Sequence, residues 1–155
     1  MNIKRCLILF LLLLPAFIFA QTAAEMDAIL GANTVSAAGA ARLVLGAADL
    51  LPEGLSGAEA ASRAYDMASS NGWVKIAAGE SVTLKDAAFL MMKAFNLKGG
   101  VMYSLFKNPR YAYREMVYRK LIMGPLDQGM KVSGASVLQI LDKTLSYTGN
   151  NGGVQ

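Results

Sequence analysis

The residues best suited to chemistry lie in the stretch 107–120. This stretch holds five cations and three tyrosines but only one acid. Three of the cations recur at spacings of three and four, which places them on one side of a predicted helix. Arginine beside tyrosine can hold carboxylates, phosphates or sugar rings by forked hydrogen bonds and stacking. A charge run on a helix is usually a solvated face, here over a Tyr-rich core edge, and the functional interpretation of the stretch is a binding site for an anionic partner. The site would consist of Lys107, Arg110, Tyr111 and Arg114.

Trp73 and the methionines also allow a chemical interpretation. Trp73 could form a platform for a sugar, although its apolar neighbours also fit burial beneath a turn. Methionine sulfurs could bind a soft metal, but methionine is a common gap filler in cores. Met91 and Met116 stand in helical apolar patterns, which favours the core. We therefore expect Trp73 to be a secondary binding candidate and expect no metal site.

The composition argues against most kinds of catalysis. The chain has no His, and its single Cys, Cys6, precedes the first apolar run. The usual general base, the thiol nucleophile and the commonest metal ligands are therefore missing. Two acid pairs could be offered as the carboxylates of an envelope glycan hydrolase: Asp66 with Glu80, and Glu115 with Asp127. Accidental pairs are expected among 11 acids, so we predict no enzyme and no cofactor and keep the hydrolase as a less favoured alternative.

The first twenty residues have the features of a secretory signal peptide. Lys4 and Arg5 precede the apolar run Leu7–Phe19, and the small residue Ala20 ends it. The run is shorter than the roughly 20 residues that a membrane span needs. We therefore predict a cleaved signal over 1–20 and export to the periplasm or cell surface. The alternative is an uncleaved anchor, which would be the only contact with a membrane.

Removal of this signal changes the charge. The whole chain has 15 Lys and Arg against 11 Asp and Glu, a net charge of +4. Without Lys4 and Arg5, 13 basic residues face 11 acids, and the net charge falls to +2. This small excess does not indicate nucleic-acid binding, so any anion affinity must come from a local cluster. About 135 residues suffice for one domain with its own core.

Three segments of the chain align without a gap over sixteen residues. They are VSAAGAARLVLGAADL from Val35, VTLKDAAFLMMKAFNL from Val82 and VSGASVLQILDKTLSY from Val132. The apolar residues recur with a period near 3.6, so each segment is predicted to form an amphipathic helix. The hydroxyl residues that follow the valines are predicted N-caps: Ser36, Thr83 and Ser133. Asp86 approximates a capping box with Thr83, where alanine should cost about 1 kcal/mol.

A second helix is predicted before each capped one. These preceding helices cover Thr22–Leu30, Gly57–Ser70 and Pro109–Met123. Connections with Gly or Pro are expected at Leu51–Gly57 and Lys98–Val101, and a flexible tail at 149–155. The predicted fold is therefore all-α, one domain over 21–148 with helix–loop–helix repeats at about 22–51, 57–97 and 106–147.

The repeat pattern resembles the S-layer homology (SLH) module. The stretch Phe106–Leu145 is similar to the SLH run from Phe-x-Asp/Asn through Ala-Tyr to a Gly turn, with Tyr111 where that family favours Trp. Asn71–Val74 resembles the Gly turn of the second unit, and Val82–Asp86 resembles the Ile-Thr-Arg-Ala-Glu motif. The resemblance implies three units packed around a pseudo-threefold axis. It also implies an exported protein held to cell-wall polysaccharide or to polymers linked to peptidoglycan.

The sequence departs from the SLH pattern where that family carries a polymer-binding Arg. The three corresponding positions are Ala37, Leu84 and Gly134. The expected function is a non-catalytic envelope binding or scaffolding module that contacts an anionic cell-wall polymer or an envelope protein. The alternative is a protein–protein adaptor without glycan binding, with Val101–Phe106 and the Tyr-rich helix as its interface.

Overall fold

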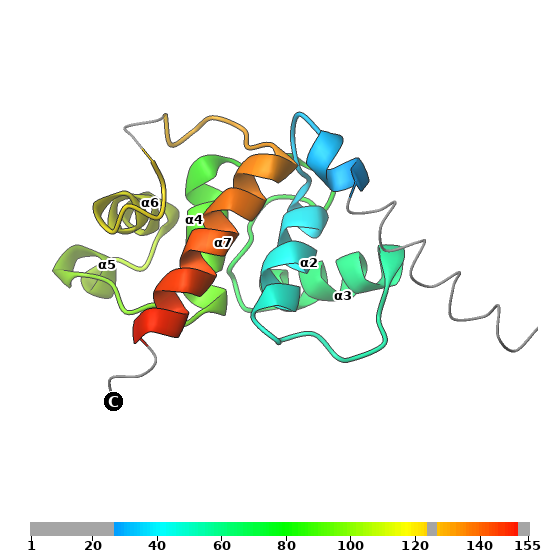
Figure 1. The fold of residues 1–155 in the computed structure, drawn as a ribbon, viewed down its shortest axis with the longest axis horizontal. Helices are drawn as coiled ribbons and strands as arrows, with labels where there is room; N and C mark the ends of the chain where they lie inside the picture. Colours follow the sequence, from blue (N-terminus) through cyan, green and yellow to red (C-terminus); the bar gives the residue numbers. More distant parts are fainter. Residues whose placement is uncertain (1–26, 124–126, 152–155) are drawn as a thin grey trace, which may run out of the picture.

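The chain folds into helices, which confirms the predicted all-α class. A computed structural model of the protein describes residues 27–123 and 127–151. Its helices are α2 (Ala37–Ala47), α3 (Gly57–Ser70), α4 (Leu84–Ala94), α5 (Val101–Leu105), α6 (Pro109–Tyr118) and α7 (Gly134–Asn151), shown in Figure 1. Residues 27–31 are also helical, and within the described ranges the only β-structure is two isolated bridges. The predicted signal peptide over 1–20 lies outside the described residues.

The three capped helices form the centre of the molecule. Helices α2, α4 and α7 contact one another, while α3 packs on α2 and α6 packs on α4. Figure 1 shows the consequence: α3 lies at one end of the molecule, and α5 and α6 lie at the other. The predicted amphipathic faces supply the buried core, for example with Val44, Leu90 and Val137. Met91 and Met116 are fully buried in it, as their helical spacing predicted.

A closed ring of backbone hydrogen bonds joins the starts of these three helices. The N–H of Val35 donates to the carbonyl of Val132 at 2.9 Å, and the N–H of Val132 donates to the carbonyl of Val82 at 3.2 Å. The N–H of Val82 donates to the carbonyl of Val35 at 3.0 Å and completes the ring. All three valines are buried. Equivalent positions of the three aligned segments therefore meet at one place in the core.

Each of the three helices also bonds its first backbone N–H group to a loop from elsewhere in the chain. Ala37 donates to the carbonyl of Glu80 at 2.8 Å, and Leu84 donates to that of Met130 at 2.9 Å. Gly134 donates to the carbonyl of Ala32 at 3.4 Å. These N–H groups have no partner inside their own helix, so the contacts satisfy them and fix how the units meet.

The predicted N-caps are confirmed. Ser36 accepts a hydrogen bond from the N–H of Gly39 at 3.2 Å, and Ser133 accepts one from the N–H of Ser136 at 3.2 Å. Thr83 and Asp86 form the predicted capping box. The Asp86 carboxylate accepts from the Thr83 N–H at 3.2 Å and from the Thr83 hydroxyl at 2.5 Å.

The predicted helix over Pro109–Met123 is wrong at its end. Helix α6 stops at Tyr118, and Lys120 takes a left-handed backbone conformation with φ 59°. The N–H groups of Leu121 and Ile122 then both bond back to the carbonyl of Met116. This turn buries Leu121 and Ile122, which a continued helix would carry away from the core. By contrast, the predicted helix Gly57–Ser70 is found with the same bounds.

Two further predictions need correction. The segment Lys98–Val101 was expected to be a simple connection, but Val101 begins the short helix α5, which lies between the second and third predicted repeats. The flexible tail was expected to begin at residue 149, but α7 continues to Asn151, so the first three tail residues are helical. Residues 152–155 lie outside the described part of the chain. None of the described helices is long and apolar enough to span a bilayer.

Candidate functional site

Helix α6 positions most of the predicted binding residues. Asn108 caps it by accepting from the N–H of Tyr111 at 3.1 Å, and Pro109 occupies its first turn, where no backbone N–H is needed. The buried side packs on α4 through the residues Ala112, Tyr113 and Met116. The helical period then leaves Arg110 and Arg114 on the exposed side.

Four of the five predicted site residues come together around α6. Lys107, Arg110 and Arg114 are exposed, and none of their side chains has a hydrogen bond or ion pair with another described residue. Tyr111 is half-buried and stacks on Phe106, with ring centroids 5.7 Å apart and an angle of 29° between the rings. The face thus combines unneutralised cations with an aromatic surface, a combination that can hold an anionic or sugar-bearing ligand.

A small hollow lies between α5 and α6. It has a volume of about 240 Å³, and its lining includes Val101, Met102, Tyr103, Tyr111 and Arg114. Arg114 is the only cation in the lining, and Glu115 is the only acid. This hollow places an apolar wall from α5 next to the cationic face of α6.

Trp73 does not join this site. It follows the end of α3 and is half-buried against the core. Helix α3 packs on α2, whereas α6 packs on α4, and the two helices lie at opposite ends of the molecule (Figure 1). Trp73 therefore lies apart from the residues around α6, and its interpretation as a separate sugar platform stays a prediction.

Two lysines that were not predicted from the sequence line the same hollow as Lys107. Lys93 and Lys98 line a hollow of about 240 Å³ together with Lys107, and no acid is among the described residues of its lining. Lys93 stands in the last turn of α4, and Lys98 precedes α5. The available signal was the spacing of Lys98 and Lys107, which bracket the apolar stretch 101–106. The cationic surface at this end of the molecule therefore extends beyond α6.

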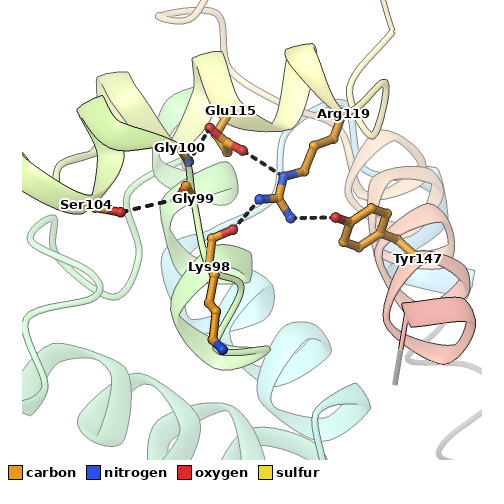
Figure 2. A network of polar contacts seen from close by, with 7 residues as sticks. All are labelled: Lys98, Gly99, Gly100, Ser104, Glu115, Arg119 and Tyr147. Carbon is orange, nitrogen blue, oxygen red and sulfur yellow. Dashed lines mark hydrogen bonds and ion pairs between the residues drawn. The ribbon is translucent and has the colours of Figure 1, made fainter. Parts of the chain in front are cut away.

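Arg119, in contrast, has a structural position. Its Nε donates to Glu115 Oε1 at 2.8 Å, and its Nη1 donates to the hydroxyl of Tyr147 at 2.8 Å. Nη2 donates to the carbonyl of Lys98, and the second oxygen of Glu115 accepts from the N–H of Gly100 at 2.9 Å. Figure 2 shows this network, which ties the end of α6 to α7 and to the segment that enters α5. Of the cations in 107–120, Arg119 therefore holds the site together and does not face a partner.

Tyr103 anchors α5 from within. Its side chain is 5% exposed, and burial raises the pKa of its phenol. Gly99 leaves the room for this ring, because a Cβ at that position would lie 2.4 Å from Tyr103 Cδ1. The hydroxyl of Ser104 donates to the carbonyl of Gly99 at 3.2 Å. Helix α5 is thus held by its inner side while its outer side stays open.

A larger hollow at the other end of the molecule has a different character. It has a volume of about 870 Å³ and is lined by residues of α2, the following loop and α7. Its lining mixes Arg42 with Asp49 and Glu53, and burial lowers the pKa of Arg42. Both signs of charge are thus present in this lining, whereas the described lining of the hollow at Lys107 carries only lysines as charged residues.

Three of the four acids considered for catalysis, Glu80, Glu115 and Asp127, bond to nearby groups of the chain. Glu80 accepts from the N–H of Ala77 at 3.2 Å, and Asp127 accepts from the N–H of Gly129 at 2.9 Å. Glu115 is paired with Arg119. Among the described residues, no group of three or more His, Cys, Asp or Glu side chains lies close enough to hold a metal ion.

The three positions where the SLH pattern carries Arg are buried. Ala37 is fully buried and Leu84 is 2% exposed. Gly134 has no room for any side chain, because a Cβ would lie 1.9 Å from the carbonyl oxygen of Ile29. Helical residues 27–31 therefore occupy the space next to Gly134. Any ligand of this chain must be held by other side chains.

Comparisons with family models, with curated proteins and with solved structures found no match to this chain.

Proposed function

We propose that this chain is a non-catalytic, exported binding module of the cell envelope that contacts an anionic polymer through α6. The observation that carries the proposal is the face formed by Lys107, Arg110 and Arg114. All three are exposed and unpaired among the described residues, and they adjoin the half-buried ring of Tyr111. Exposed cations with no acid to neutralise them attract polyanions, and an adjacent aromatic surface adds contacts to sugar rings.

We also propose that the three units are degenerate SLH-like repeats around a pseudo-threefold axis. The ring of hydrogen bonds among Val35, Val82 and Val132 supports this arrangement, since it links the same position of each unit in a closed cycle. The equivalent N-caps support it further. In this proposal the module has kept the packing of the repeats and has moved its ligand contacts to α6.

The test is binding to purified cell-wall sacculi. The protein should pellet with sacculi at low salt and be released as salt is added, because exposed ion pairs are screened. An Arg110→Ala/Arg114→Ala variant should pellet several-fold less well. The matched control is Arg63→Ala/Lys75→Ala, which removes two exposed cations near α3 and should pellet as the parent does.

Two outcomes would contradict the proposal. If the Arg110→Ala/Arg114→Ala variant pellets as well as the parent, the site is not on α6. If the parent ignores sacculi but elutes in a discrete complex with another envelope protein, the chain is an adaptor and does not bind the polymer.

A further inference from the structure

Helix α5 and the residue after it expose an unusual amount of apolar surface. Four side chains within six residues are largely exposed: Val101 at 75%, Met102 at 49%, Leu105 at 69% and Phe106 at 53%. They stand at the end of the molecule where α5 lies (Figure 1). A cluster of this kind marks a contact with another protein or with a membrane, whereas single exposed apolar residues need no explanation.

This apolar tip is held in place and is not a loose loop. Tyr103 is buried beneath it, and the close approach of Gly99 to that ring fixes the entry into the helix. The network in Figure 2 adds the bonds from Arg119 to the carbonyl of Lys98 and from the Gly100 N–H to Glu115. The chain therefore presents its apolar side chains outward from a fixed base.

Cations lie beside the tip at two hollows, with Lys98 and Lys107 at one and Arg114 at the other. Lys98 and Lys107 bracket it in sequence, and both line the same hollow beside α5. The stretch 93–120 contains seven Lys and Arg but a single acid, Glu115, which is paired with Arg119. Any surface that takes up the apolar tip must therefore accept a dense positive charge around it.

We propose that the α5 tip docks on an anionic lipid bilayer, with its four exposed apolar side chains in the headgroup boundary and the flanking cations on the lipid phosphates. Long cationic side chains around an inserted apolar segment are the usual arrangement of proteins that lie on membranes. A stable protein interface involves about 20–30 residues from each partner, whereas the tip has six residues. A bilayer can take up a short apolar segment flanked by cations. The proposal goes beyond polymer binding, which uses the cations of α6 and does not require the apolar side chains. It also needs no spanning helix and no N-terminal segment.

The first test is partitioning of the full chain onto vesicles. We expect binding to vesicles of phosphatidylcholine with phosphatidylglycerol and much weaker binding to phosphatidylcholine alone. A Val101→Ser/Leu105→Ser variant should partition about tenfold less well, because it removes two side chains that would become partly buried. The matched control is Leu30→Ser/Leu50→Ser, which removes two exposed apolar side chains elsewhere and should bind as the parent does. Residues 1–20 are present in every variant, and far-UV circular dichroism checks that each one is folded.

The second test locates the inserted part. The chain carries Cys6→Ser and either Leu105→Cys or Leu50→Cys, labelled with an environment-sensitive fluorophore. The label at 105 should shift to the blue with anionic vesicles, and the label at 50 should not. The proposal is overturned if the label at 105 does not shift, if Val101→Ser/Leu105→Ser binds vesicles like the parent, or if the parent binds no vesicles. It is also overturned if the parent forms a protein complex or self-associates but does not bind vesicles, and Val101→Ser/Leu105→Ser loses that association. If sacculus binding fails but the label at 105 shifts, the proposal of polymer binding is wrong and the proposal of membrane docking stands.

Discussion

Arg114 and Arg119 show how two arginines of one segment take different tasks. Arg114 is exposed and has no partner among the described residues, so it is available to a ligand. The side chain of Arg119 is only 16% exposed and engages Glu115, Tyr147 and the carbonyl of Lys98. Both residues lie in one charged stretch of the sequence, and only their contacts in the structure distinguish the two roles.

Replacing Arg119 should therefore weaken the fold, whereas replacing Arg110 should not. We expect Arg119→Ala to lower the free energy of unfolding by about 2 kcal/mol, because it removes charged hydrogen bonds to partly buried partners. Arg119→Lys should rescue little, since an ammonium cannot reproduce the fork of a guanidinium. Urea denaturation measures both changes, with Arg110→Ala as the control. Equal effects of Arg119→Ala and Arg110→Ala would refute this role.

At the scale of helices, sequence predicted the elements whose signals are local. The capped helices and α3 could be found because their N-caps, their apolar period and the Asn71-Gly72 stop all lie within the segment. Helix α5 was missed because its five residues are too short for a period, and tertiary bonds from Arg119 and Glu115 hold it. The end of α6 was missed because burial of Leu121 and Ile122, a tertiary effect, ends it.

The candidate site was predicted in part for the same reason. Arg110 and Arg114 could be predicted from helical spacing, which is local. Lys93 and Lys98 could not, because the packing of α4 and α5 brings them to the site.

The capping box of α4 should contribute measurably to stability. Thr83→Ala removes the hydroxyl that bonds Asp86 and should lower the free energy of unfolding by about 1 kcal/mol. Ser56 supplies a control because it occupies the N-cap of α3 without a side-chain bond to that helix. Ser56→Ala should therefore change the stability by less than about 0.5 kcal/mol. Chemical denaturation measures the loss of unfolding free energy in each variant. Equal losses would show that the capping box contributes nothing.

Gly134 should tolerate no side chain. A Cβ there would lie 1.9 Å from the carbonyl oxygen of Ile29, so Gly134→Ala has to displace residues 27–31. We expect a loss of about 1–3 kcal/mol, in the range of overpacked sites. Gly46→Ala is the control, because nothing lies within 4 Å of its Cβ and alanine favours a helix by about 0.5–1 kcal/mol. Hydrogen exchange at residues 27–31 should speed up only in the Gly134 variant. Unchanged exchange there would show that this contact is not tight.

At the scale of the whole molecule, the three units share one core. Val35, Val82 and Val132 bond in a ring, and each of the helices α2, α4 and α7 takes a loop carbonyl from elsewhere in the chain for its first N–H group. Side chains from all three helices belong to a single buried cluster. The apolar faces of the three units are therefore buried against one another.

The described part of the chain should therefore unfold in a single transition. Trp73, the only tryptophan, reports from the end of α3, whereas far-UV circular dichroism reports from all helices. Their urea midpoints should coincide, as they do in a two-state domain. A fluorescence change that precedes the loss of helix would instead mean that α3 and its unit open independently.

The valine ring also bears on the order in which this protein can be made. Residues 35 and 82 complete the ring only with residue 132, which is synthesised last of the three. Before residue 132 has been synthesised, two of the three hydrogen bonds of the ring lack a partner, so the contacts between distant segments are only partly made. A chain whose ring stays open until the third unit has been made can still be threaded through a translocation channel before that point, which suits the export that we propose.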